Sequence, residues 1–259
     1  MPVVLWLPAG LGLVFLVLPL AALLVRAPWS TLPDQLRSPV VRQALALSVL
    51  TASAATALCL LVGVPLAWAL ARATFRGQRV VRALITVPLV LPPVVGGVAL
   101  LLALGRRGVV GRYLDQWFGL TIPFTTTAVV LAEAFVAMPF LVLAVEGALR
   151  GMDQRYEEAA ATLGASRWLT FRRVTLPLVA PGVVAGAVLC WTRALGEFGA
   201  TITFAGSLQG RTETIPIAVY QTVERGDTLA AAAISLVLIA VSLTVLIALR
   251  GRWVGGLAS

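Results

Sequence analysis

The chain has 259 residues, of which 59% are hydrophobic and only 12% are charged, and its mean hydropathy is +0.96. A soluble domain typically carries about 45–50% apolar and about 25% charged residues, so this composition excludes an ordinary soluble domain and indicates a chain solvated by lipid. The formal net charge is +9, and all 20 basic residues are arginine. Because the arginines gather between long apolar runs, they indicate loops beside membrane spans and no nucleic-acid-binding surface.

Residue content also excludes several kinds of chemistry. The chain has no histidine, which excludes imidazole catalysis and imidazole metal ligation. Cys59 and Cys190 both fall inside apolar runs, where cysteine behaves as a small hydrophobic residue, so they predict neither a disulfide framework nor a metal site. The few carboxylates within the apolar runs are scattered, which disfavours a membrane enzyme. We therefore expect no catalytic residue, no metal and no cofactor in this chain.

Six apolar stretches are long enough to cross a bilayer, which takes roughly 20 apolar residues per helix. They run from about 3–25, 44–70, 83–104, 125–145, 176–195 and 228–249. The first stretch could instead be a cleaved signal peptide, but it lacks a basic n-region and a convincing cleavage site, so we favour a retained helix. We predict an all-α, polytopic membrane protein with six transmembrane helices, in which residues 1–259 form a single transmembrane domain.

An even number of spans places both termini on the same side of the membrane. Eleven arginines lie in the loops on that side, eight lie in the loops on the other side, and Arg193 lies within or beside the fifth span. The positive-inside rule thus favours cytoplasmic termini by a small margin only.

Prolines and glycines interrupt the third predicted span, at Pro88, Pro92, Pro93, Gly96 and Gly97. Backbone groups freed within a membrane need protein or water as partners. The stretch therefore either faces a translocation pathway, where it would form a gate with the fifth span, or marks a kink and close-packing site between helices. The sequence leaves both interpretations open.

The fourth and fifth spans contain small and charged residues. Gly182 and Gly186 have the spacing of a small-residue packing face. Arg193 and Glu197 lie four residues apart, so on a helix they can form an ion pair. We prefer a structural ion pair near the outer interface, and a pathway role in which Arg193 attracts a dianion is the alternative. Glu133 is expected to face the bundle and to find a hydrogen-bond donor there; we assign it no role.

An arginine-rich connection, residues 151–175, separates the fourth and fifth spans. Residues 157–163 are rich in helix formers, Gly164 breaks the run, and Ser166 is a candidate N-cap for a second short helix over 167–173. The sequence therefore predicts two short helices separated by a glycine, ahead of a fifth span that begins with a Leu-Pro pair.

The spacing within this connection resembles the signature of ABC-importer permeases: Glu-Ala-Ala, three residues, Gly, nine residues, an aliphatic residue, one more residue, then Leu-Pro. The matching residues are Glu158, Ala159, Ala160, Gly164, Val174, Leu176 and Pro177. The only departure is Val174, where isoleucine is commoner. An amphipathic connector resting on the membrane surface is the alternative, but it leaves this spacing unexplained.

The resemblance implies a type I ABC-importer permease fold in a bacterial cytoplasmic membrane, with residues 151–175 forming a cytoplasmic coupling helix seated in an ATPase subunit. It also implies cytoplasmic termini, a homodimer, two ATP-binding cassette subunits, and a periplasmic or extracellular oxyanion-binding protein. The chain has no G-x-x-x-x-G-K-[ST] motif and no lysine, so ATP and Mg must be used by the partner ATPase. Residues 206–227 are a candidate docking surface for the binding protein, or else a loop that covers the bundle.

Three further segments, 86–111, 193–206 and 213–227, resemble molybdate permeases of the oxyanion-importer branch. The resemblance implies molybdate as the substrate, with tungstate and sulfate or thiosulfate as alternatives. A stand-alone secondary transporter or channel is a more remote alternative, because it would not explain the signature and because no convincing internal repeat relates the two halves.

Overall fold

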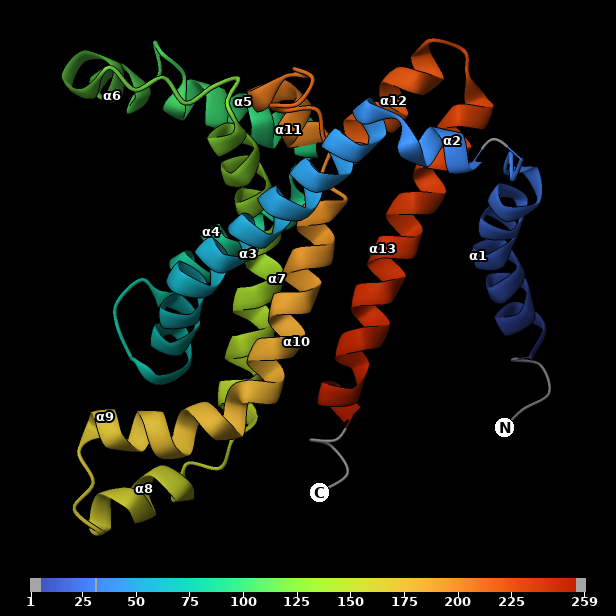
Figure 1. The fold of residues 1–259 in the computed structure, drawn as a ribbon. Helices are drawn as coiled ribbons and strands as arrows, with labels where there is room; N and C mark the ends of the chain where they lie inside the picture. The colour runs from blue at the N-terminus through green and yellow to red at the C-terminus, as the bar shows by residue number, and fades with distance from the viewer. Residues whose placement is uncertain (1–5, 31, 255–259) are drawn as a thin grey trace.

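The computed structural model describes residues 6–30 and 32–254, with side chains as far as residue 247, and this part of the chain is helical without a strand. The long helices are α1 (Trp6–Arg26), α3 (Pro39–Arg72), α7 (Thr126–Gly151), α10 (Leu176–Leu195) and α13 (Thr228–Val254). The shorter helices are α2 (Leu32–Arg37), α4 (Gln78–Val90), α5 (Pro93–Leu104), α6 (Gly111–Phe118), α8 (Arg155–Thr162), α9 (Arg167–Thr170), α11 (Gly199–Ala205) and α12 (Ile215–Glu224). Figure 1 shows α7, α10 and α13 running between two ends of the molecule, with α8 and α9 at one end and α6, α11 and α12 at the other.

Five of the described helices are long and apolar enough to cross a membrane, and the bent pair α4–α5 would make a sixth span. This confirms the all-α, polytopic architecture. The interruption expected within residues 83–104 is present as a bend, because α4 and α5 meet at an angle of 119°. Leu91 has the extended conformation favoured before proline and ends α4, and Pro92 and Pro93 supply no backbone N–H that could continue it.

The main core forms where α3, α7 and α10 pack together. Gly182 and Gly186 of α10 face Ala148 and Ala144 of α7. A Cβ at Gly186 would lie 3.0 Å from the Cβ of Ala144, so larger side chains would push the two helices apart. The predicted small-residue packing face is therefore confirmed. Both cysteines are buried as free thiols in the same core.

At the end opposite α8 and α9, the short helix α11 packs against α5. A Cβ at Gly97 of α5 would lie 2.8 Å from the carbonyl oxygen of Ala200 and 2.7 Å from the Cβ of Thr203. In the other direction, a Cβ at Gly199 of α11 would lie 2.7 Å from the Cβ of Pro93. Because glycine on each helix admits the backbone or side chain of the other, α5 and α11 form one closely packed unit.

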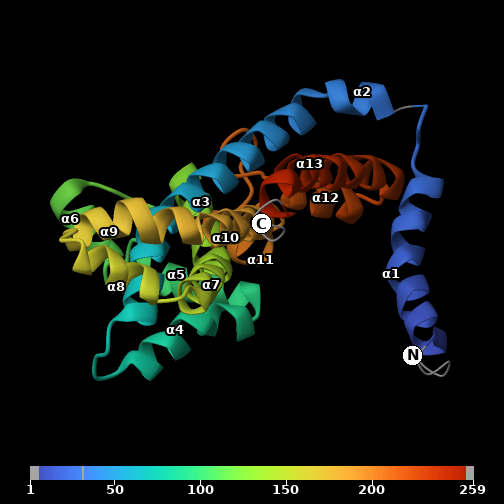
Figure 2. The same ribbon diagram turned by 90° about the horizontal axis from the view of Figure 1, so that it is seen from below.

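Helix α1 stands away from the α3–α7–α10 core (Figures 1 and 2). None of its residues is buried, and large apolar side chains point outward along its length. Such a surface is stable only against lipid or against another protein chain. The first described turn of α1 and the last described turn of α13 both lie toward the α8–α9 end of the molecule (Figure 1).

Candidate functional site

Helices α8 and α9 form a hairpin at one end of the bundle (Figure 1). Between them, Gly164 has a φ of +81°, a left-handed conformation that other residues rarely adopt, so the reversal of the chain depends on glycine. The Ser166 hydroxyl then accepts a hydrogen bond from the Leu169 N–H (3.3 Å) and caps α9. The predicted order of helix, glycine break and serine N-cap is confirmed.

The sequence predicts a second short helix that ends before the fifth span. In the structure this helix continues into the span without a break. Arg167–Leu195 is one continuous 29-residue helix, called the rod below, in which a π-helical turn at Phe171–Thr175 joins α9 to α10. The rod bends where α9 meets α10 (Figure 1). Pro177 explains the wide turn, because it has no N–H to donate to the carbonyl four residues earlier. Val174 is half-buried on this rod, whereas Leu176 and Pro177 are exposed. The hairpin is therefore continuous with a membrane-spanning helix.

Glu157 attaches the hairpin to the bundle. Its Oε1 accepts a hydrogen bond from the Thr175 hydroxyl (2.6 Å) and lies 3.5 Å from Nη2 of Arg72 in α3. Sequence reasoning missed all three residues. For Glu157 and Thr175, their places in the sequence could have indicated a role: Glu157 directly precedes the first residue of the signature, and Thr175 lies between Val174 and Leu176.

The outward side of the hairpin carries the first half of the signature. Glu158 and Ala159 are exposed, Ala160 is half-buried, and Gly164 is exposed at the turn. Leu163 beside it is 88% exposed. This exposed set of small, apolar and acidic residues is called the α8 surface below, and it comprises Tyr156, Glu158, Ala159, Leu163 and Gly164.

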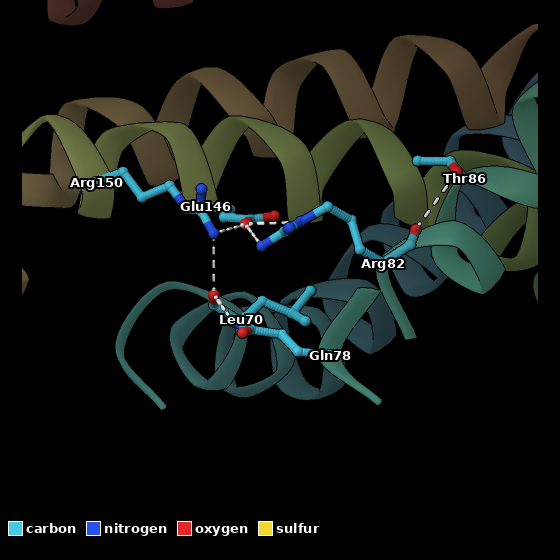
Figure 3. Close-up of polar contacts among 6 residues, drawn as sticks. All are labelled: Leu70, Gln78, Arg82, Thr86, Glu146 and Arg150. Carbon is cyan, nitrogen blue, oxygen red and sulfur yellow. Dashed lines mark hydrogen bonds and ion pairs between the residues drawn. The ribbon is translucent and has the colours of Figure 1, made fainter. Parts of the chain in front are cut away.

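A second polar cluster joins three helices at the same end of the molecule (Figure 3). Glu146 of α7 is 7% exposed, and its Oε1 accepts hydrogen bonds from Nη2 (2.7 Å) and Nε (3.1 Å) of Arg82 in α4. Nη2 of Arg150 lies 3.0 Å from the same oxygen and also donates to the carbonyl of Leu70 (3.3 Å), which accepts a further bond from Gln78 Nε2 (2.6 Å). The cluster pairs a buried carboxylate and caps the last turn of α3.

The two carboxylates buried between the spans also have partners. Glu197 is 1% exposed; its Oε2 lies 2.6 Å from Nη2 of Arg193, and its Oε1 accepts the N–H of Ala200 (2.8 Å). The predicted ion pair is present, and it connects the end of α10 to the start of α11. Glu133 accepts a hydrogen bond from the Thr51 hydroxyl (2.9 Å), which confirms the expectation that it faces the bundle and finds a donor.

The candidate gate residues of the third predicted span separate into two kinds. Gly96 and Gly97 are buried, and a Cβ at Gly96 would lie 3.1 Å from Phe135, so the close-packing interpretation holds for both glycines. Pro92 and Pro93 are exposed at the bend between α4 and α5. The two prolines therefore keep an exposed surface in the chain, whereas the two glycines are packed inside it.

Residues 206–227, a candidate docking surface, are only partly available to a partner. The segment contains α12, and the stretch 212–215 is buried against the bundle. The Ser48 hydroxyl of α3 accepts the N–H of Ile215 (2.8 Å), and Thr126 donates to the carbonyl of Arg211 (2.9 Å). Part of this segment therefore covers the bundle, and its exposed parts lie at residues 208–211 and 223–227.

The described helices are long and apolar enough to cross a membrane several times. The described residues contain no group of three or more His, Cys, Asp and Glu that could hold a metal ion. They contain an exposed hairpin at one end, a continuous helix that runs from the hairpin through the bundle, and the packed α5–α11 unit at the other end. These features define a class: a polytopic membrane permease.

Comparison with known proteins identifies the family. Residues 63–254 match the family described as binding-protein-dependent transport system inner membrane component, and the chain belongs to that family. It is 51% identical over 248 residues to the molybdenum transport system permease protein ModB of Mycobacterium bovis, covering 95% of this chain and 93% of that protein. It is 36% identical over 251 residues to the sulfate transport system permease protein CysT of Escherichia coli, covering 94% and 90%.

A solved structure supports the fold independently. A bacterial ABC transporter involved in the import of the acidic polysaccharide alginate aligns with a TM-score of 0.73 and 19% sequence identity, covering 96% of this chain and 93% of that one. The likeness at such low identity concerns the fold alone, and it confirms the predicted ABC-importer permease architecture.

Proposed function

We propose that the chain is the transmembrane permease subunit of an ABC importer for molybdate, and that a separate ATPase drives it through the α8 surface. The α8 surface carries this proposal. Glu158, Ala159 and Gly164 of the importer signature are exposed there, whereas the neighbouring Glu157 is bonded to the bundle. Exposed small and apolar residues on a firmly attached helix have the chemistry of a protein docking surface.

A continuous path connects this surface to the opposite end of the molecule. Glu157 links α8 to Thr175 on the rod, and the rod continues through α10 to Arg193. The Arg193–Glu197 pair then joins α10 to α11, which packs against α5 at Gly97. Each contact is a short hydrogen bond, an ion pair or close packing. We therefore expect a displacement of the hairpin to move α10, α11 and α5 with it.

In the proposed cycle, ATP and Mg bind to the partner ATPase pair, whose closure brings two α8 surfaces together. The rods then move with the α5–α11 units and open the pathway outward, and hydrolysis reverses the motion. The gate in this scheme is the exposed bend at Pro92 and Pro93, with Gly96 and Gly97 holding α5 against its neighbours.

The assembly that we propose is a homodimer with two ATP-binding cassette subunits and a periplasmic or extracellular oxyanion-binding protein. One chain supplies half of a symmetric pathway, and its fully exposed α1 requires lipid or a second chain around it. The α8–α9 end faces the cytoplasm of a bacterial cytoplasmic membrane. Both termini are cytoplasmic in this orientation, in keeping with the direction of α1 and α13 in Figure 1.

Molybdate is favoured over sulfate because the molybdenum permease of M. bovis is 51% identical to this chain and the E. coli sulfate permease is 36% identical. The pathway itself is expected to bind the oxyanion weakly, since the charge of Arg193 is already compensated by Glu197 at 2.6 Å. Selectivity then rests largely with the binding protein. Tungstate is the alternative substrate.

Two measurements on intact cells test the proposal. Capture of the tagged chain from membranes should recover an ATPase subunit, and recovery of the chain alone would count against it. In a strain deprived of its own molybdate uptake, the chain with its ATPase and binding protein should restore molybdate accumulation. Unlabelled tungstate should compete, whereas a hundredfold excess of sulfate should not; equal competition by sulfate would assign the assembled importer, this chain with its binding protein, to the sulfate group.

A further inference from the structure

A groove of about 370 Å³ lies between the lower part of α3 and the start of the rod. Val64, Pro65 and Trp68 of α3 form one wall, and Arg167, Trp168 and Phe171 form the other. The rings of Trp168 and Phe171 are stacked, with centroids 5.7 Å apart and an interplanar angle of 27°. The lining is thus almost entirely aromatic and aliphatic, with one permanent positive charge.

That charge has no counter-ion within the described chain. Arg167 is exposed, and none of the five ion pairs among the described residues includes it. Arg172 and Arg173 lie one turn further along the same rod, are also exposed, and are likewise missing from those five pairs. The groove therefore has one uncompensated positive charge, that of Arg167, beside an apolar floor.

The groove lies beside the end of the apolar helix α3, where we expect the chain to leave the bilayer. Trp68 is four residues from the end of α3 at Arg72, and the rod has its first residue at Arg167. Tryptophan is enriched at this level because its ring is amphipathic, and basic pockets between helices bind the headgroups of acidic lipids. Figure 2, seen from below, shows α9 crossing this end of the bundle.

We propose that the groove binds one anionic phospholipid, with its phosphate beside Arg167 and an acyl chain along Val64 and Trp68. A peptide segment fits less well, because its backbone N–H and C=O groups would find almost no partners on this lining. Free phosphate also fits less well, because the apolar floor has almost no hydrogen-bond donors for its oxygens. The α8 surface, which we assign to the ATPase, is made of other residues.

The bound lipid would have a mechanical consequence, which rests on the proposed function. It would connect α3 to α9 across the groove and so support the hairpin from the side opposite Glu157. Lipid composition would then influence how firmly the hairpin is held. The binding itself does not depend on this consequence and is tested separately.

Native mass spectrometry of the transporter, purified as the assembled complex, tests the binding. Added phosphatidylglycerol should be retained per permease chain, and phosphatidylcholine should be retained much less. Arg167→Gln should weaken phosphatidylglycerol retention about fivefold, the effect of one arginine at an anionic surface. Arg76→Gln is the matched control, since Arg76 is exposed on a loop at the same end, outside the groove and outside the five ion pairs, and it should retain the lipid fully.

A second measurement uses the tryptophans of the groove. Brominated phosphatidylglycerol should quench the fluorescence of the wild type more strongly than brominated phosphatidylcholine, and replacing both groove tryptophans, Trp68→Phe with Trp168→Phe, should remove most of that difference. Equal retention of the two lipids, or full retention by Arg167→Gln, would overturn the proposal. Displacement of the lipid by inorganic phosphate would identify a free-anion site instead. If Arg167→Gln no longer captures the ATPase but still retains the lipid, the groove belongs to the ATPase contact. If the wild type captures no ATPase, that result counts against the proposed function only.

Discussion

Glu157 and Thr175 are separated by 18 positions in the sequence, yet Oε1 of the glutamate and Oγ1 of the threonine lie 2.6 Å apart. This bond joins the first turn of α8 to the π-helical turn that begins the membrane-spanning rod. The adjacent Glu158 points away and is exposed. Two consecutive glutamates therefore have different tasks, one holding the hairpin to the permease and the other available to a partner.

Removing the threonine hydroxyl should loosen the hairpin without removing the docking surface. Thr175→Val keeps the shape of the side chain but leaves Glu157 with Arg72 alone, 3.5 Å away. We expect a loss of about 1–2 kcal/mol in stability, because the bond has a charged acceptor that can still reach water. Uptake should fall severalfold while ATPase capture stays normal. Thr162→Val is the control, since the Thr162 hydroxyl bonds only to the carbonyl of Ala159 within α8, and it should transport normally.

Reversing the charge of the exposed Glu158 should leave stability unchanged and should weaken capture of the ATPase. Glu158→Arg changes an exposed residue in the first turn of α8, where an acid is favoured by only a few tenths of a kcal/mol, so thermal unfolding should barely change. Capture of the ATPase from membranes should fall at least tenfold, and uptake should be lost. Normal capture by this variant would mean that α8 is not the ATPase contact.

The Glu146 cluster should contribute to stability more than surface ion pairs do. Glu146→Gln leaves Arg82 and Arg150 facing each other without the shared carboxylate, and it weakens the cap on the Leu70 carbonyl. We expect a loss of about 1–3 kcal/mol, limited because both arginines can reach solvent. The measurement is thermal unfolding in detergent. Asp115→Asn, which breaks the exposed pair with Arg106 at the other end, is the control and should cost less than about 1 kcal/mol.

Packing between α5 and α11 can be tested with one methyl group. Gly97→Ala would place a Cβ 2.8 Å from the Ala200 carbonyl oxygen and should cost about 1–3 kcal/mol, because backbone cannot move aside easily. Uptake should fall if the two helices move as one unit. Gly147→Ala, also within a helix but with no atom near the added Cβ, should be neutral or slightly stabilising. Equal effects of the two substitutions would argue against a special role for the α5–α11 contact.

A double substitution separates the two interpretations of Arg193. Arg193→Gln leaves the carboxylate of Glu197 buried with only the Ala200 N–H as a partner, so it should destabilise the chain by several kcal/mol. Arg193→Gln combined with Glu197→Gln should recover most of that stability. If the pair is structural, the double variant also recovers uptake; if Arg193 attracts the anion, the double variant folds but remains inactive. Folding and uptake assays on the same preparations decide between them.

The apolar runs and the signature were sufficient to predict the membrane architecture and the hairpin. Gly164 and Ser166 were also predictable, because a left-handed turn and an N-cap depend on local residue type. The bend at Pro92 was expected as an interruption, but its 119° angle was not, because the angle depends on the packing of α5 against α11. Local sequence contains no such distant contact.

Polar contacts between different helices likewise could not be predicted from local sequence. Arg193 and Glu197 were predicted as a pair because four residues on one helix bring them together. The bonds from Glu157 to Thr175 and from Arg82 to Glu146 cross between helices, and any of the 20 arginines could have been the partner on composition alone. Such pairings require the tertiary arrangement, and the residues that connect α8 to the bundle were therefore missed.

The most direct test of the account is a photo-crosslinker placed at Leu163, the 88% exposed residue at the tip of the hairpin. Irradiation of membranes should produce an adduct with the cytoplasmic ATPase subunit, identified by mass spectrometry, and the same crosslinker at Leu189 on the membrane-spanning rod should not. An adduct from position 163 with a periplasmic protein, or the absence of any ATPase adduct from that position in an actively transporting membrane, would contradict the account.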